Sequence, residues 1–143
     1  MAPKIGSYRE LVVWQQAMDL AVSIYGATRS WPKEELYGLT AQIRRAATSV
    51  PANIAEGYGR ESRATYQQFL KIAQGSLKEL ETHLLIAQRV GIASTETVDD
   101  LMKLSERGGK APQTSDPQAL DHLTLLPYCP TALLPYCPTA LLP

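Results

Sequence analysis

Five basic residues in the middle of the chain have the types and spacing of an anion-binding surface: Arg44, Arg45, Arg60, Arg63 and Lys71. On a helical wheel, Arg44 and Arg45 point away from the apolar stripe of their own segment. No acid occurs between Glu35 and Glu56, so neither arginine has an acidic partner close in sequence. Such cations could contact the phosphates of a nucleic acid. The alternative is solvated charge, or pairing with Glu56, Glu61 or a neighbouring subunit, and the sequence leaves both interpretations open.

The glycine motifs do not support nucleotide chemistry. Gly57-x-Gly59 follows a predicted helix rather than a strand, and it lacks the third glycine of a dinucleotide-binding fingerprint. Gly109 and Lys110 lack both the upstream glycine and the hydroxyl residue of a phosphate-binding loop. Both pairs are typical of turns.

Carboxylates, histidines and cysteines do not combine into a catalytic or metal site. His83 is preceded by Glu79 four residues back, whereas di-iron bundles use paired Glu-x-x-His motifs. Glu79 and Glu81 lie on different sides of a helix, so they are not a catalytic pair. Cys129 and Cys137 belong to identical copies of one octapeptide, and this spacing supports neither a disulfide framework nor a metal site. We therefore expect a non-enzymatic protein with no catalytic residue, no metal and no cofactor.

Length and charge limit the possible partners. The 143 residues suit one domain, and 14 Lys and Arg balance 14 Asp and Glu, so the formal net charge is zero. An anionic partner must therefore be bound by a local patch. No apolar run approaches the roughly 20 residues of a membrane span, and the N-terminus lacks a signal-type apolar core. We expect a cytoplasmic protein that does not contact a membrane.

Apolar periodicity and capping signals predict four helices and no strand. The first spans residues 8–30, the second runs from the acids at 34–35 to the glycines at 57 and 59, the third spans 62–91, and a short fourth spans 94–109. The short connections favour an all-α fold, an antiparallel up-and-down four-helix bundle. In the second helix we expect a core stripe of Leu36, Leu39, Ile43, Ala46 and Val50.

Pro51 interrupts the second predicted helix, where its missing N–H releases the carbonyl of Ala47. Such a defect typically costs about 3 kcal/mol unless the bend is used or compensated. We interpret Pro51 as a kink that shapes the helix around the core. The alternative is that the bend directs residues 53–58 toward a neighbouring subunit.

The first two helices carry more apolar surface than one core needs. The first has two apolar stripes, one of Leu11, Trp14, Met18, Ala21 and Tyr25 and another of Val13, Ala17, Leu20 and Ile24. The second has a face of small residues opposite its core stripe, which would allow another backbone to approach closely. Alanines that merely favour a solvent-exposed helix are the simpler explanation for that face. Because the first helix tips the balance toward a homo-oligomer, we predict an interface of Val13, Leu20, Ala41, Thr48 and Ala52.

Three stretches carry a resemblance to a known family: YRELVVWQQAMDLAVSIY, WPKEELYGLTAQIRRAATSVPANIAEGYGR and FLKIAQGSLKELETHLLIA. They closely resemble the bacterial four-helix bundle family, also called the 23S rRNA intervening sequence protein family, to which the accessory protein of diversity-generating retroelements is similar. The resemblance implies an antiparallel four-helix bundle that assembles as a homopentamer and binds ribosomal RNA or other nucleic acid, with no established enzymatic activity. Its basic surface would comprise Arg44, Arg45, Arg60 and Arg63, with Pro51 as the kink of the second helix.

The C-terminal region departs from that family, whose fourth helix usually continues for several more turns. We divide the chain into a bundle domain at 1–107 and a low-complexity tail at 108–143 that contains an unchanged octapeptide repeat. Its prolines forbid a continuous helix, and it has almost no charge. We expect the tail to be disordered. The alternative is that it covers the groove that a full fourth helix would have filled.

The expected function is therefore that of a homo-oligomer, a pentamer according to the resemblance, that associates with ribosomal RNA or other structured RNA or DNA. The alternative is a protein–protein scaffold, such as an accessory subunit of a reverse transcriptase, with no direct nucleic-acid binding.

Overall fold

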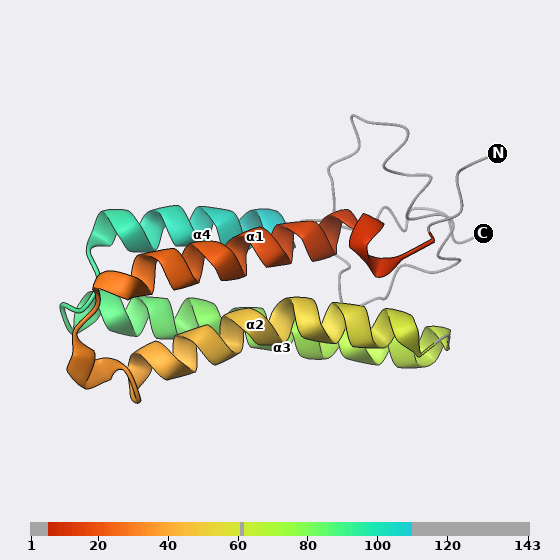
Figure 1. Ribbon diagram of the computed structural model, residues 1–143, viewed down its shortest axis with the longest axis horizontal. Helices are drawn as coiled ribbons and strands as arrows, with labels where there is room; N and C mark the ends of the chain where they lie inside the picture. Colours follow the sequence, from red (N-terminus) through yellow and green to blue (C-terminus); the bar gives the residue numbers. More distant parts are fainter. Residues whose placement is uncertain (1–5, 61, 110–143) are drawn as a thin grey trace, which may run out of the picture.

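The computed structural model describes residues 6–60 and 62–109, and this part of the chain contains four α-helices and no strand. The helices are α1 (Val12–Ala27), α2 (Leu39–Gly59), α3 (Arg63–Arg89) and α4 (Thr95–Gly109). They run along the long axis of the molecule, with α1 beside both α2 and α4, and α2 beside α3 (Figure 1). The predicted all-α class and the existence of all four helices are confirmed. Nearly all of the predicted tail, from residue 110 onward, lies outside the described residues.

The predicted first helix is divided into three pieces. A 3₁₀ turn, Tyr8–Glu10, precedes α1, and another, Thr28–Ser30, follows it. The capping residues act at the first turn: the Ser7 hydroxyl accepts from the Arg9 N–H at 3.3 Å, and the Glu10 carboxylate accepts from the Gly6 N–H at 3.1 Å. Leu11 separates this turn from α1, because its backbone is extended, with ψ of 119°. Its side chain is buried in the core.

The second helix begins later than the acids at 34–35 suggested. These acids belong to a 3₁₀ turn, Lys33–Glu35, and α2 starts only after Gly38. The Glu35 carboxylate still acts as a cap, because it accepts a hydrogen bond from the Leu39 N–H at 3.1 Å. The turn takes Leu36 out of the helical phase of α2, so the prediction that Leu36 belongs to the core is wrong, and its side chain is 42% exposed.

One apolar core joins the four helices, and it contains most of the residues that helical periodicity predicted. Leu77, Leu80 and Leu84 of α3 are buried, and each stabilises the fold by roughly 1.5 to 3 kcal/mol relative to an exposed side chain. The helices α1, α2 and α4 contribute Ala17, Leu20, Ile24, Ile43, Ala46, Val50, Ile54, Val98 and Leu101. The core therefore takes the second apolar stripe of α1, together with Leu11 and Ala21 from the first.

The contact between α2 and α3, which we call the α2–α3 seam, is close along its length. A Cβ atom added to Gly57 would lie 2.6 Å from the Cβ of Phe69, so only glycine fits there. One end of the seam holds an edge-to-face pair of Tyr58 and Tyr66, and its middle holds a hydrogen bond of 2.9 Å between the hydroxyls of Ser49 and Ser76.

The helix α2 continues through Pro51, whose ring is buried. Hydroxyl and amide side chains bond the backbone within one turn of it. Thr48 donates to the carbonyl of Arg44 at 3.0 Å, and Asn53 donates to the carbonyl of Ser49 at 2.8 Å.

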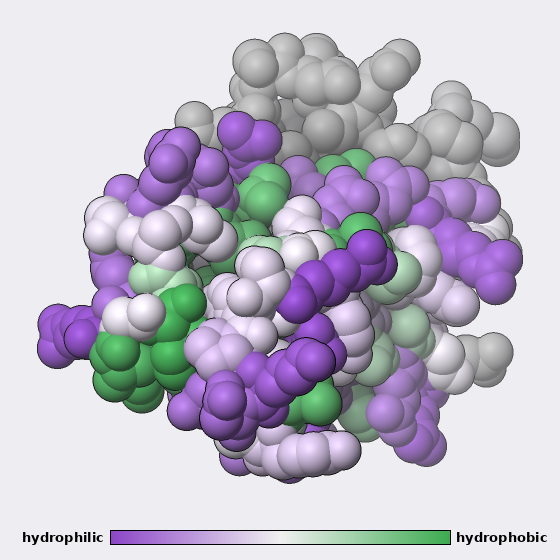
Figure 2. Space-filling view, turned by 60° about the vertical axis from the view of Figure 1, so that its left-hand side comes forward, coloured by the Kyte–Doolittle hydropathy of each residue, from purple (hydrophilic) through white to green (hydrophobic). Residues whose placement is uncertain are grey.

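Several large apolar side chains remain exposed outside the core, in α1, in α3 and in the connection between α1 and α2. Apolar residues reach the surface among polar ones at the end of the molecule that carries this connection (Figure 2).

Candidate functional site: an aromatic groove with a cationic end

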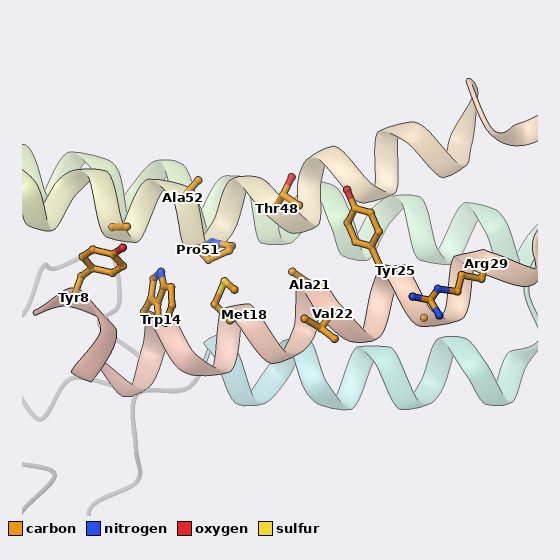
Figure 3. Close-up of a pocket in the computed structure, with 12 residues that line it drawn as sticks. Tyr8, Trp14, Met18, Ala21, Val22, Tyr25, Arg29, Thr48, Pro51 and Ala52 are labelled. Carbon is orange, nitrogen blue, oxygen red and sulfur yellow. The ribbon is translucent and has the colours of Figure 1, made fainter.

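A groove of about 660 Å³ lies between α1 and α2 (Figure 3). Its walls are mostly apolar and come from these two helices and from the turns at either end of α1. The lining residues are Tyr8, Trp14, Met18, Ala21, Val22, Tyr25, Gly26, Arg29, Thr48, Pro51, Ala52 and Ala55.

The α1 wall of the groove carries the large side chains. Trp14, Met18 and Tyr25 share one stripe of α1 and point toward α2 (Figure 3). Trp14 packs edge to face with Tyr8, with 5.2 Å between ring centroids, and this pair closes one end of the groove. Met18 is 37% exposed and Trp14 is half-buried, so the described helices leave part of this apolar stripe uncovered.

The α2 wall carries small side chains. Ala52, Ala55 and Pro51 present methyl and ring carbons, and the hydroxyl of Thr48 is already bonded to the backbone of its own helix. The groove therefore sets large side chains of α1 against small side chains of α2, and the Thr48 hydroxyl on the α2 wall already has a partner.

Two arginines make the opposite end of the groove cationic. The Arg44 guanidinium lies over the Tyr25 ring, 4.9 Å from its centroid, and its Nε donates to the Thr28 hydroxyl at 2.9 Å. That hydroxyl donates in turn to the carbonyl of Ile24 at 2.8 Å, which fixes both partners. Arg29 lines the groove one turn beyond Tyr25. Within the described ranges, no carboxylate forms an ion pair with Arg29 or Arg44.

The structure does not gather the five predicted basic residues into one patch. Arg44 and Arg60 are sixteen residues apart in a helix, which separates them by about 24 Å. Arg60 forms an ion pair with Glu56 at 2.7 Å, and its guanidinium lies 5.8 Å from the Phe69 ring centroid. The pairing with Glu56 that the sequence left open is therefore present.

The other predicted cations are exposed, and they follow Arg44 or Arg60 along the chain. Arg45 is exposed and donates to the side chain of Gln42 at 2.8 Å. Arg63 and Lys71 are exposed in the first part of α3, whereas Glu61 lies outside the described residues.

The predicted interface residues divide between groove and core. Thr48 and Ala52 line the groove, and Ala41 lies half-buried near the start of α2. Val13 packs against the core. Leu20 is only 1% exposed, so its assignment to an outer face is wrong: the chain's own core already buries it.

Trp14, Met18 and Tyr25 belonged to a predicted apolar stripe but not to the predicted interface. The available signal was that the first predicted helix has two apolar stripes, which is more apolar surface than one core needs. Arg29, which follows the predicted stripe, gave no separate signal.

Other site types find no support in the described part of the chain. It contains no group of three or more His, Cys, Asp or Glu side chains that could hold a metal ion, and His83 is half-buried in α3. Among the helices described, none is long and apolar enough to cross a membrane.

Comparison with known proteins gives a family and a fold. A search of curated proteins finds no match. A crystal structure of a protein with unknown function from the S23 ribosomal protein family of Bacteroides thetaiotaomicron is similar, with 27% sequence identity and a TM-score of 0.61. The similarity covers 68% of this chain and 91% of that one. Residues 9–111 match the 23S rRNA-intervening sequence protein family, and the chain therefore belongs to that family.

Proposed function

We propose that this protein is a non-enzymatic, antiparallel four-helix bundle that assembles into a homo-oligomer, and that the oligomer binds structured RNA. One observation carries the proposed assembly: the groove between α1 and α2 exposes large apolar side chains along one wall. The family name, which refers to an intervening sequence of 23S rRNA, supports RNA as the partner. The pentamer implied by the sequence resemblance is the oligomeric state that we propose.

Self-association would remove the apolar groove from water. Apolar surface contributes roughly 25 cal/mol for each Å² buried, and an extended exposed apolar patch on a small domain is typical of an interaction site. The opposed large and small walls leave room between the helices for side chains of a second copy.

Light scattering on the full chain over a range of concentrations tests self-association. Met18→Glu places a charge in the groove and should reduce the measured mass toward that of the monomer, since a buried unpaired charge is costly. Ile72→Glu is the matched control, because Ile72 is 45% exposed on α3 and lies outside the groove lining. Equal masses for the two variants, or a monomeric wild type, would contradict the proposed assembly.

Assembly would also bring together enough basic side chains for phosphate binding, although few are exposed on one copy. Arg45, Arg63 and Lys71 are too few on one copy for firm phosphate binding, but a ring repeats them and makes binding multivalent. Each phosphate contact should add slightly less than one to the slope of log affinity against log salt.

The salt dependence of binding to a structured RNA tests the second half of the proposal. Arg45→Gln should weaken binding and flatten the slope, because Arg45 has no carboxylate partner among the described residues. Arg60→Gln is the matched control and should have the smaller effect, since Glu56 already neutralises Arg60. Identical slopes for wild type and both variants would argue against phosphate contacts at these positions.

A protein scaffold with no direct RNA contact, such as a reverse-transcriptase accessory subunit, is the second candidate. The internal contacts of Arg44 and Arg60 favour it, because they withdraw two of the predicted cations from ligand binding. An oligomer that retains its mass but shows no salt-dependent RNA binding would favour the scaffold.

A further inference from the structure

The connection between α1 and α2 displays a second apolar surface, made of residues outside the groove lining. Tyr37 is 92% exposed and its neighbour Leu36 is also exposed, so both side chains face water. We call this pair the knob. In Figure 1 the connection, coloured orange, projects beyond α2 on the side away from α1.

Backbone hydrogen bonds on both sides fix the backbone of the knob. Trp31, at the start of the connection, is buried in the core. The N–H of Leu36 donates to the carbonyl of Lys33 at 3.1 Å, and the N–H of Gly38 donates to the carbonyl of Glu35 at 3.0 Å. A side chain presented on such a bonded turn loses little conformational entropy when a partner covers it.

We propose that the knob of one copy inserts into the groove of the next copy, at the end formed by Tyr25, Gly26 and Arg29. The inference rests on the proposed self-association and names the two surfaces that perform it. A Cβ atom added to Gly26 would meet nothing within 4 Å, so this end of the groove has open space for an incoming ring.

The positions of the two surfaces fit a closed ring. A two-fold interface pairs one patch with itself, whereas contact between two different patches is heterologous and closes into a ring when the rotation permits. An odd-numbered ring requires the second kind of contact. If the ring axis follows the helices, touching surfaces lie at the same height, and both the knob and the Tyr25 end of the groove lie at the α1–α2 connection.

Charge complementarity supports the same pairing. The knob follows Lys33, Glu34 and Glu35, which together carry a net charge of −1, whereas the groove end carries Arg29 and Arg44. Glu34 is exposed and forms no ion pair within the described residues. In the assembled ring, Glu34 of one copy faces Arg29 of the next.

Mixing two defective variants of the full chain tests the heterologous contact. The knob variant Leu36→Ser/Tyr37→Ser retains an intact groove. The groove variant Val22→Glu/Gly26→Glu places two charges at the Tyr25 end of the groove and retains an intact knob. Each should be monomeric alone, with self-association weakened tenfold or more. An equimolar mixture should form a heterodimer of twice the monomer mass and nothing larger, because only one productive contact remains.

A control variant and a charge exchange test whether the loss of assembly is specific to the knob-to-groove contact. Val90→Ser removes an exposed apolar side chain outside the groove lining and should leave the oligomer intact. Glu34→Arg and Arg29→Glu should each weaken assembly, and the two together should restore it in a chain whose circular dichroism is unchanged.

The outcomes separate this inference from the proposed assembly. A knob variant that retains the wild-type mass, or a mixture of variants that remains monomeric, would overturn the knob-to-groove contact while leaving self-association through the groove in place. A wild type that is monomeric throughout would overturn both.

Discussion

The helix α2 has two flanks, and its neighbours contact them in opposite ways. On the α3 side, Gly57 brings the backbone so near that an added Cβ would lie 2.6 Å from Phe69. On the α1 side, small residues of α2 face Trp14 and Met18 across a groove of about 660 Å³. Small side chains therefore close the α2–α3 seam but leave the α1–α2 contact open.

The difference lies in what the opposing helix presents. In α3, Phe69 meets a glycine, and Ser76 bonds to Ser49, so the backbones can approach. In α1, the large side chains of Trp14 and Met18 project toward α2 on the side where Pro51 lies (Figure 3). A stripe of small residues therefore does not define an interface until the facing residues are known.

The largest effect should come from adding a methyl group to the seam. Gly57→Ala should reduce the free energy of unfolding by about 1 to 3 kcal/mol, because Phe69 and Tyr66 leave no room for a Cβ. Gly75 lies in α3, and a Cβ atom added to it would meet nothing within 4 Å. Gly75→Ala should therefore raise the free energy of unfolding by roughly 0.5 to 1 kcal/mol through helix propensity. Urea denaturation at one fixed protein concentration measures both, and equal signs would disprove the close approach.

Removing the arginine that joins the ends of α1 and α2 should have a smaller effect. Arg44→Met loses the hydrogen bond to Thr28 and the stacking on Tyr25, at a cost of about 1 to 2 kcal/mol. Arg45→Met is the control and should change the free energy of unfolding by less than about 0.5 kcal/mol, because Arg45 is exposed. The comparison fails if both substitutions cost the same.

The close packing of the α2–α3 seam should also make the stability of the fold depend on pH above pH 10. Burial, and secondarily the charge of Tyr58, raise the pKa of Tyr66 to about 12 from the ordinary tyrosine value of 10.0. The unfolded chain therefore loses this proton first, so stability is complete below pH 10 and falls as the pH rises toward 12. Near pH 11 the loss is on the order of 1 kcal/mol.

Tyr66→Phe removes this contribution, so its difference from wild type isolates it. Ultraviolet absorbance of tyrosinate reports the titration directly. An ordinary tyrosine titration at position 66 would show that water reaches this end of the seam.

The smallest effect on the fold should come from filling the groove. Ala52→Leu has room to adopt a relaxed rotamer against Met18, so the free energy of unfolding should change by less than about 0.5 kcal/mol. The same substitution should weaken self-association, because the larger side chain would fill part of the groove that the proposed interface uses. Calorimetry and light scattering on one sample separate the two effects, and a large loss of stability would show that the groove is already filled.

Sequence periodicity located all four α-helices of the described residues, because each carries an apolar stripe between start and stop signals. It misplaced the start of α2, where a local hydrogen bond from a side chain changes the helix boundary. The Glu35 carboxylate caps Leu39 from a 3₁₀ turn, and this delays α2 and exposes Leu36. Such a turn looks like the first turn of a helix until its hydrogen bonds are known.

The candidate site was only partly predictable. Periodicity detected two apolar stripes on α1, but it could not determine which one faces inward, because both are continuous and similarly apolar. Packing distinguishes the two stripes: Leu20 and Ile24 are fully buried in the core, whereas Trp14 packs only partly against it and also lines the groove. The separation of Arg44 from Arg60 could have been read from helix length, whereas the ion pair of Arg60 with Glu56 needed side-chain geometry.

The order in which the helices touch has a consequence for how the chain acquires its structure. The contacts of α1 with α2, α2 with α3 and α3 with α4 all join neighbours in sequence, and only the contact of α1 with α4 joins the two ends. Local contacts form quickly because little loop-closure entropy opposes them. During synthesis, the first three helices can therefore associate before α4 exists, and α4 then completes the core with Val98 and Leu101. We expect pulse-labelled hydrogen exchange to protect the amides of α2 and α3 before those of α4.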